Sequence, residues 1–179
     1  MAAFESLVFR HQKKMFNIAL RMTGSAEDAA EVVQDAFVSA FRGIGSFAGT
    51  SRFSTWLCSI VINQSRNRLK QLKSRAAHET ISIDDPVLTE EGSLKVEYAS
   101  QSLTVDKALE DKQRRLKVIE CLGRLETTFR EVVILRDMQG FSYEEVGASL
   151  GLPEGTVKSR LYRGREALKD CLKKFLGEL

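Results

Sequence analysis

Basic and hydrogen-bonding side chains crowd into Thr156–Glu166, where the sequence reads TVKSRLYRGRE. At about 100° per residue, apolar positions of the wider segment fall on one side of a helix: Val157, Leu161, Gly164, Leu168, Leu172 and Phe175. Ser159, Tyr162, Arg163 and Glu166 project from the other side, and Arg160 and Arg165 lie on its flanks. Such a helix can read base edges while its flanks hold phosphates. A basic helix that only packs and stays soluble is the alternative.

The residues before this helix have the signals of a tight helical turn. Ser142 and Glu145 have the spacing of a capping box, which begins a short helix ending near Leu150. Gly151 suits the position after a helix end, and Pro153 suits the first turn of the next helix. Phe141–Asp170 is therefore predicted to be a helix-turn-helix.

Charge alternates along the chain. Gln64–Arg75 has five basic residues and no acid, and the linker after it is acidic: six acids against Lys95 in Ala76–Glu97. Thr156–Lys174 is basic again. This order is typical of two nucleic-acid-facing modules joined by an acidic connector, although a charged run is also an ordinary solvated face.

Apolar residues recur at helical spacing, which predicts an all-α protein. Helices are expected over Phe4–Met22, from Ser25 to about Ile44, and over Phe53–Lys73, Asp106–Leu122 and Glu126–Met138, before the hairpin. Gly43–Arg52 is expected to be a loop. The second helix is expected to bury Ala29, Val33, Ala36, Phe37 and Phe41. Two small helical domains, 1–75 and 106–179, are predicted on either side of an irregular, flexible acidic linker over 76–105.

Several protein classes are disfavoured by absent motifs. The 3 cysteines are odd in number and widely spaced, so buried or half-buried thiols are expected rather than a disulfide or zinc site. No glycine-rich phosphate loop or nucleophile elbow occurs, so neither an enzyme nor a cofactor is expected. No membrane-spanning run or signal peptide is recognisable, which favours a cytoplasmic protein.

Three stretches resemble a known family. LETTFREVVILRDMQGFSYEEVGASLGLPEGTVKSRLYRGREAL, from Leu125, resembles region 4 of the bacterial extracytoplasmic-function (ECF) sigma factors. AEVVQDAF, from Ala30, and SFAGTSRFSTWLCSIVINQSRN, from Ser46, resemble their region 2. The resemblance covers most of residues 10–70 and 122–174. It implies a dissociable, non-catalytic subunit that directs core RNA polymerase to promoters, in a stress or envelope response and under control of an anti-sigma protein.

The resemblance also implies two DNA-binding surfaces. Region 4 would read the upstream (minus-thirty-five) element through Lys158, Ser159, Arg160, Tyr162, Arg163 and Arg165. Region 2 would bind and melt the downstream (minus-ten) element through Phe47, Ala48, Gly49, Thr50, Trp56, Asn63, Arg66 and Asn67. Arg66, Arg68 and Lys70 would meet phosphates. Trp56 is either a core aromatic residue that fixes the loop, which we favour, or a stacking surface for melted DNA.

The polymerase-binding face implied by the resemblance lies on the second helix: Glu31, Val33, Gln34, Asp35 and Phe37. Core packing equally accounts for the two apolar residues. The acidic linker would enter the RNA exit path, or it is only a solvated tether. The family's Ala-Glu-Asp before Val-Val-Gln reads Ala29-Ala30-Glu31 here. Gln64–Asn67 is a stretch that varies with promoter choice, so the downstream sequence is not predicted.

Two other functions fit part of the sequence. A stand-alone helix-turn-helix repressor or activator would need a ligand-sensing or dimerising N-terminal half, and the region 2 pattern occupies that half instead. An adaptor would bind proteins through its helices and never touch DNA. Promoter-specific binding only in the presence of core polymerase distinguishes a sigma factor from both.

Overall fold

The computed structural model describes residues 2–79 and 105–176, and every regular element within them is helical. The all-α prediction is confirmed. The elements are α1 (Ala2–Thr23), α2 (Ala26–Gly43), the 3-10 turn η1 (Ile44–Ser46), α3 (Phe53–Glu79), α4 (Val105–Arg124), α5 (Thr127–Val133), the π-helical segment η2 (Ile134–Met138), α6 (Tyr143–Leu150) and α7 (Glu154–Leu176). Most of the predicted linker lies outside the described residues.

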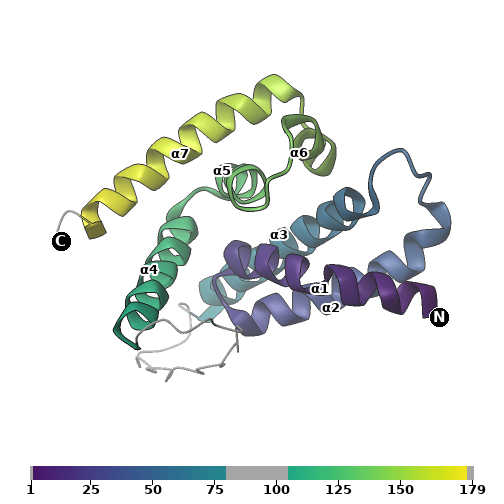
Figure 1. The fold of residues 1–179 in the computed structure, drawn as a ribbon, viewed down its shortest axis with the longest axis horizontal. Coiled ribbons are helices and arrows are strands. Elements are labelled where there is room, and N and C mark those ends of the chain that lie inside the picture. The colour runs from purple at the N-terminus through teal and green to yellow at the C-terminus, as the bar shows by residue number, and fades with distance from the viewer. Residues whose placement is uncertain (1, 80–104, 177–179) are drawn as a thin grey trace.

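Helices α1, α2 and α3 form an N-terminal unit around a common apolar core (Figure 1). The predicted cap of α2 is confirmed, because the Ser25 hydroxyl accepts from the Asp28 N–H at 3.2 Å. The predicted buried face of α2 is partly wrong. Val32 is buried and Val33 only half-buried, while Phe41 is 50% exposed. Ala29, Ala36 and Phe37 are buried as expected, so the apolar stripe follows Ala29, Val32, Ala36 and Ala40.

The C-terminal unit consists of α4, α5, η2, α6 and α7. The predicted Glu126–Met138 helix changes character after Val133, where the Gln139 N–H donates to the carbonyl of Ile134, five residues back. The capping box of α6 is confirmed by hydrogen bonds in both directions between Ser142 and Glu145, at 2.9 and 3.0 Å. Gly151 ends α6 with a φ of 66°, a conformation that glycine adopts without strain.

The turn of the helix-turn-helix also depends on a missing side chain. A Cβ at Gly147 would lie 2.7 Å from the carbonyl oxygen of Leu152. Gly147→Ala is therefore expected to displace the turn and cost about 1–3 kcal/mol of unfolding free energy, as overpacking does elsewhere. Urea unfolding measures this loss. Gly155→Ala is the matched control, because a Cβ there meets nothing within 4 Å and alanine favours the helix. Equal stabilities of the two variants would contradict the close approach.

The expectation of free thiols at all cysteines is wrong. Cys121 of α4 and Cys171 of α7 form a disulfide, with a Cα–Cα distance of 5.8 Å across a sequence separation of 50. The fold brings together two helix positions that spacing alone left unrelated. Cys58 is free and buried, as expected, and burial raises the pKa of its thiol to about 12. The disulfide ties the C-terminal half of α7 to α4.

The two units lie against each other, with α5 and α6 between α7 and the N-terminal bundle (Figure 1). Contacts join α1 to α4, α5 and η2, and α3 to α6. The expectation of two helical units is confirmed, and the structure adds an interface between them.

Candidate nucleic-acid interface

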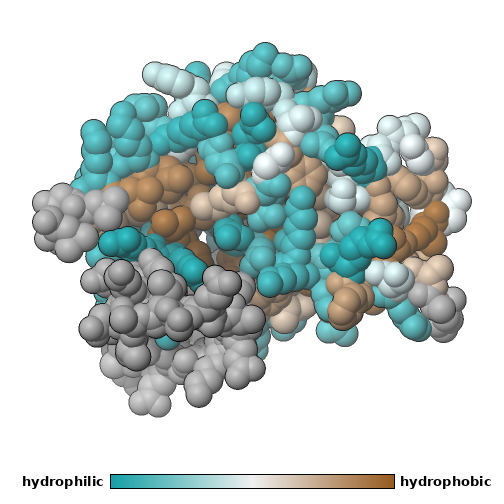
Figure 2. Space-filling view, viewed as in Figure 1, coloured by the Kyte–Doolittle hydropathy of each residue, from teal (hydrophilic) through white to brown (hydrophobic). Residues whose placement is uncertain are grey.

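Helix α7 presents its predicted reading face to solvent. Ser159, Tyr162 and Arg163 are all exposed, and Tyr162 retains 69% of its accessible surface. The predicted apolar stripe faces inward: Val157, Leu161 and Gly164 are buried, and the positions nearer the C-terminus are half-buried. Hydrophilic side chains line the outer edge of α7, above an apolar area between α7 and α4 (Figure 2). An amphipathic helix with an open polar face is the shape that enters a major groove.

Several of the α7 cations predicted to contact DNA are engaged in ion pairs. Arg165 donates to both carboxylate oxygens of Asp137, at 2.9 and 2.5 Å. Lys158 pairs with Glu154 at 2.6 Å, and this hydrogen bond raises the pKa of Lys158. Spacing could have revealed the Glu154 pair, since i,i+4 partners share a helix face. Of the four α7 cations predicted to contact DNA, Arg163 alone has no ion pair among the described residues, since Lys158, Arg160 and Arg165 are each paired.

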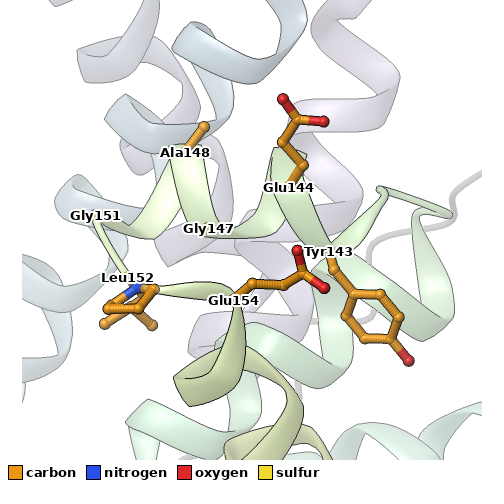
Figure 3. A pocket seen from close by; sticks show the side chains of 8 residues that line it. Tyr143, Glu144, Gly147, Ala148, Gly151, Leu152 and Glu154 are labelled. Carbon is orange, nitrogen blue, oxygen red and sulfur yellow. The ribbon is translucent and has the colours of Figure 1, made fainter.

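A groove of about 550 Å³ lies over the helix-turn-helix turn. Figure 3 shows it between α6 and the start of α7, with the Glu144 carboxylate on one side and the Glu154 carboxylate directed toward the Tyr143 ring. The residues that line this groove include two carboxylates, one of them paired with Lys158, and no cation, which makes the groove unfavourable for phosphate. Phosphate contacts are therefore expected farther along α7, beyond Glu154.

The loop before α3 rests on an aromatic cluster. Phe47 stacks on Trp56 with ring centroids 4.9 Å apart, and Phe53 contacts both rings. Trp56 is half-buried against the core, the position that we favoured for it. Ala48, Gly49 and Thr50 are exposed beside the cluster. The loop therefore offers a small exposed surface on a rigid aromatic base.

Sequence reasoning missed one member of this cluster. His11 of α1 packs against Phe53 with a centroid distance of 5.5 Å. Burial lowers the pKa of His11, and the neighbouring positive charges of Arg10 and Lys14 lower it further. The lowered pKa favours the uncharged imidazole against this ring. Only the tertiary fold reveals this contact.

The predicted DNA-facing residues of α3 differ in exposure and in ion pairing. Asn63 and Asn67 are exposed, one turn apart. Arg66 is bound to Glu131 of α5 through two hydrogen bonds of 2.8 and 2.7 Å. Arg68 is paired with Asp28 and Glu31 of α2, at 2.6 and 2.8 Å. The expectation that Arg68 meets phosphates is therefore not met in this conformation, because its guanidinium fastens α3 to α2.

The predicted polymerase-binding face of α2 is partly exposed. Glu31, Gln34 and Asp35 are accessible, whereas Phe37 retains only 8% of its surface and packs edge-on against Phe4. Core packing therefore accounts for Phe37. The exposed apolar area of α2 comes instead from Val38 and Phe41, at 43% and 50% exposure. Both lie within one or two turns of Gln34, at helical spacing that could have identified them.

None of the helices in the described ranges is long and apolar enough to cross a bilayer.

Family models for sigma-70 region 2 and sigma-70 region 4 match residues 7–75 and 115–168, respectively. The chain is 32% identical to the RNA polymerase sigma-H factor of Pseudomonas aeruginosa, covering 98% of this chain and 89% of that protein. It is 35% identical to the ECF RNA polymerase sigma-E factor of Escherichia coli, covering 94% and 85%.

Two solved structures share the fold. The sigma factor RpoE of Bartonella quintana, in complex with the anti-sigma factor NepR, has a TM-score of 0.71 and 23% identity, covering 97% of this chain and 98% of that one. CnrH, in complex with the cytosolic domain of CnrY, has a TM-score of 0.68 and 26% identity, covering 97% and 89%. Both similarities extend over the two helical units.

Proposed function

We infer function from one premise: the chain belongs to the sigma-70 family, as an ECF sigma factor. It is a sigma factor that directs RNA polymerase to promoters and is controlled by an anti-sigma factor. Within this function, we propose which surfaces bind promoter DNA and polymerase, together with several general properties of the protein. They include a purely non-catalytic role, action in the cytoplasm and a stress or envelope response.

Upstream promoter reading is assigned to the exposed face of α7. The observation that carries this assignment is the outward row of Ser159, Tyr162 and Arg163 above a buried apolar stripe. Arginine and hydroxyl groups are suited to base edges, while Lys158, Arg160 and Arg165 at the sides are suited to phosphates. The domain limits 1–75 and 106–179 are proposed to separate the two DNA-binding units.

Downstream promoter melting is assigned to the loop before α3. Ala48, Gly49 and Thr50 form an exposed rim on the Phe47–Trp56 stack, which gives an unpaired base a rigid apolar surface with small neighbours. Asn63 and Asn67 present amides on the adjoining face of α3. Arg66 joins this surface only when it leaves Glu131.

Polymerase binding is assigned to α2. Glu31, Gln34 and Asp35 are accessible there, and Val38 and Phe41 supply the apolar contact that a partner helix requires. Val33 is half-buried and contributes at the edge, while Phe37 supports the face from beneath. CnrH is seen in complex with the cytosolic domain of CnrY, which supports a protein partner for this chain.

Run-off transcription with core polymerase tests these assignments. Arg163→Ala is expected to lower transcription from a promoter with an upstream element about 5- to 100-fold, the cost of losing one base-reading arginine. Binding to core polymerase, measured by co-elution, should be unchanged. Lys169→Ala is the matched control, since Lys169 is an exposed cation of α7 that lies six residues beyond Arg163 and is paired with Glu166.

Two results would contradict the assignments. Loss of core binding in Arg163→Ala would place α7 in the polymerase interface instead of on DNA. Tight binding of the chain alone to a palindromic operator would identify a stand-alone repressor or activator.

A further inference from the structure

A buried carboxylate joins the two predicted DNA-binding surfaces. Glu131 of α5 retains 1% of its side-chain surface and accepts two hydrogen bonds from Arg66 of α3, at 2.8 and 2.7 Å. Arg160 of α7 approaches the same carboxylate at 3.8 Å. We refer to Glu131, Arg66 and Arg160 as the Glu131 junction. Arg66 belongs to the proposed downstream DNA-binding surface, and Arg160 belongs to the upstream one.

The Glu131 carboxylate binds Arg66 as a DNA phosphate would, whereas Arg160, at 3.8 Å, is beyond hydrogen-bond distance. A guanidinium binds carboxylate and phosphate through the same planar fork of N–H groups, so one partner excludes the other. Arg66 also donates to the Asn63 side-chain oxygen at 3.1 Å, which engages one of the proposed base-reading amides. The paired state therefore withholds Arg66, and part of the surface around it, from nucleic acid.

Further contacts hold the same interface closed. Arg130, beside Glu131 in sequence, donates to the Met22 carbonyl of α1 at 2.5 Å. The Ser149 hydroxyl of α6 donates to the Thr55 carbonyl of α3 at 3.4 Å. The Lys14 ammonium lies 4.2 Å from the centre of the Phe141 ring. The contacts run from α1 to α3, so Glu131 belongs to a continuous surface between the units.

The closed arrangement is too short for a promoter. Elements named minus-ten and minus-thirty-five are separated by about 25 base pairs, or roughly 85 Å at 3.4 Å per base pair. A compact chain of 179 residues has a radius of gyration of about 16 Å, which corresponds to roughly 40 Å across. Simultaneous contact with both elements therefore requires the two units to separate, and separation breaks the Arg66–Glu131 bond.

We propose that Glu131 is an internal competitor of promoter DNA, which holds the free chain closed by binding Arg66 across the interface with Arg160 beside it. This proposal rests on the DNA-binding roles assigned above. Opening frees Arg66 for the downstream element. Arg160 lies on the same unit as Glu131, 3.8 Å from its carboxylate and beyond hydrogen-bond distance, so its N–H groups stay available to phosphate. The closed free chain binds promoter DNA weakly, and the opened chain binds it at both ends.

Energy transfer across the interface tests the closed state. A donor and an acceptor attached to unnatural side chains at Gln12 and Ala167, which are exposed on α1 and α7, report separation of the units in the full chain. Glu131→Gln removes the charge and keeps the shape, and it is expected to increase the donor–acceptor distance. The affinity of the free variant for promoter DNA should rise about 10-fold, within the usual range of coupling between sites.

Glu120→Gln is the matched control for charge. It also removes one carboxylate from an arginine pair, the exposed Arg124–Glu120 pair of α4, so the change in net charge is the same. An equal rise in DNA affinity for both variants would overturn the proposal, because general electrostatics would then explain it. An unchanged distance in folded Glu131→Gln would overturn it as well.

Arg66→Gln provides a second route should the Glu131 variant fail to fold. Arg66 keeps 37% of its side-chain surface and lies outside the apolar core cluster, so its replacement removes no apolar core contact, and the same increase in distance is expected. A closed Arg66→Gln protein would overturn the proposal. Run-off transcription separates this result from the proposed function. If the variants open, but neither they nor the parent chain initiates transcription, the Glu131 junction is supported and the DNA-binding assignments are refuted.

Discussion

Reduction of the Cys121–Cys171 disulfide is expected to destabilise the C-terminal unit by about 4 kcal/mol, because the bond closes a loop across a sequence separation of 50. The loop encloses α5, η2, α6 and most of α7. Opening it gives the unfolded chain more conformations and leaves the folded unit with its noncovalent contacts alone. Urea unfolding with and without a thiol reductant measures the difference.

The loss of stability on reduction of the disulfide should be uneven along α7. The half before Gly164 is held by buried Val157 and Leu161, whereas Leu168, Leu172 and Phe175 are only half-buried. Hydrogen exchange after reduction is therefore expected to rise over residues 165–176 and to change little over residues 156–164. The reading face of α7 should keep its shape.

Thiol counting and a serine variant complete this test. The oxidised chain should expose one thiol to a titrant after unfolding, Cys58, and the reduced chain three. Cys171→Ser should match the reduced protein and show no response to reductant. Cys58→Ala should respond like the parent chain. Three thiols without reductant would contradict the disulfide.

Local signals explain most of what the sequence predicted correctly. The capping pair Ser142 and Glu145 and the glycine at position 151 act within one or two helical turns, so their residue types specify the structure directly. The stripe of α7 is equally local. The exposed reading face of that helix follows from the same periodicity, and it was predicted residue by residue.

Contacts between distant segments could not be predicted in this way. Arg66 and Glu131 are 65 residues apart, and both are charged residues that usually face solvent. Helical periodicity gave no reason to place Glu131 inside an interface. On α2, Val33 was predicted to be buried in place of its apolar neighbour Val32, because packing against α1 and α3, which selects Val32, is not visible in the sequence.

Replacement of Arg130 by methionine is expected to cost about 3–5 kcal/mol of unfolding free energy, because it leaves three backbone carbonyls without this donor, at about 1–3 kcal/mol for each one that stays unpaired. Its guanidinium donates to three carbonyls: Met22 at 2.5 Å, Gly123 at 2.5 Å and Leu125 at 2.9 Å. Met22 and Gly123 lie in the last turns of α1 and α4, so the cation also meets the negative ends of two helix dipoles. Burial lowers the pKa of Arg130, but the group stays charged.

Comparison with two other variants isolates the cause. Arg130→Lys should recover only part of the stability, since one ammonium does not reproduce the planar fork that reaches all three carbonyls. Arg124→Met, at an exposed arginine paired with Glu120, should cost less than about 1 kcal/mol. Because the Met22 bond crosses the interface, Arg130→Met should also separate the two units in the energy-transfer assay. Equal stabilities of Arg130→Met and Arg124→Met would contradict this prediction. Water would then replace the guanidinium at the carbonyls of Met22, Gly123 and Leu125, and Arg130 would not hold the two units together.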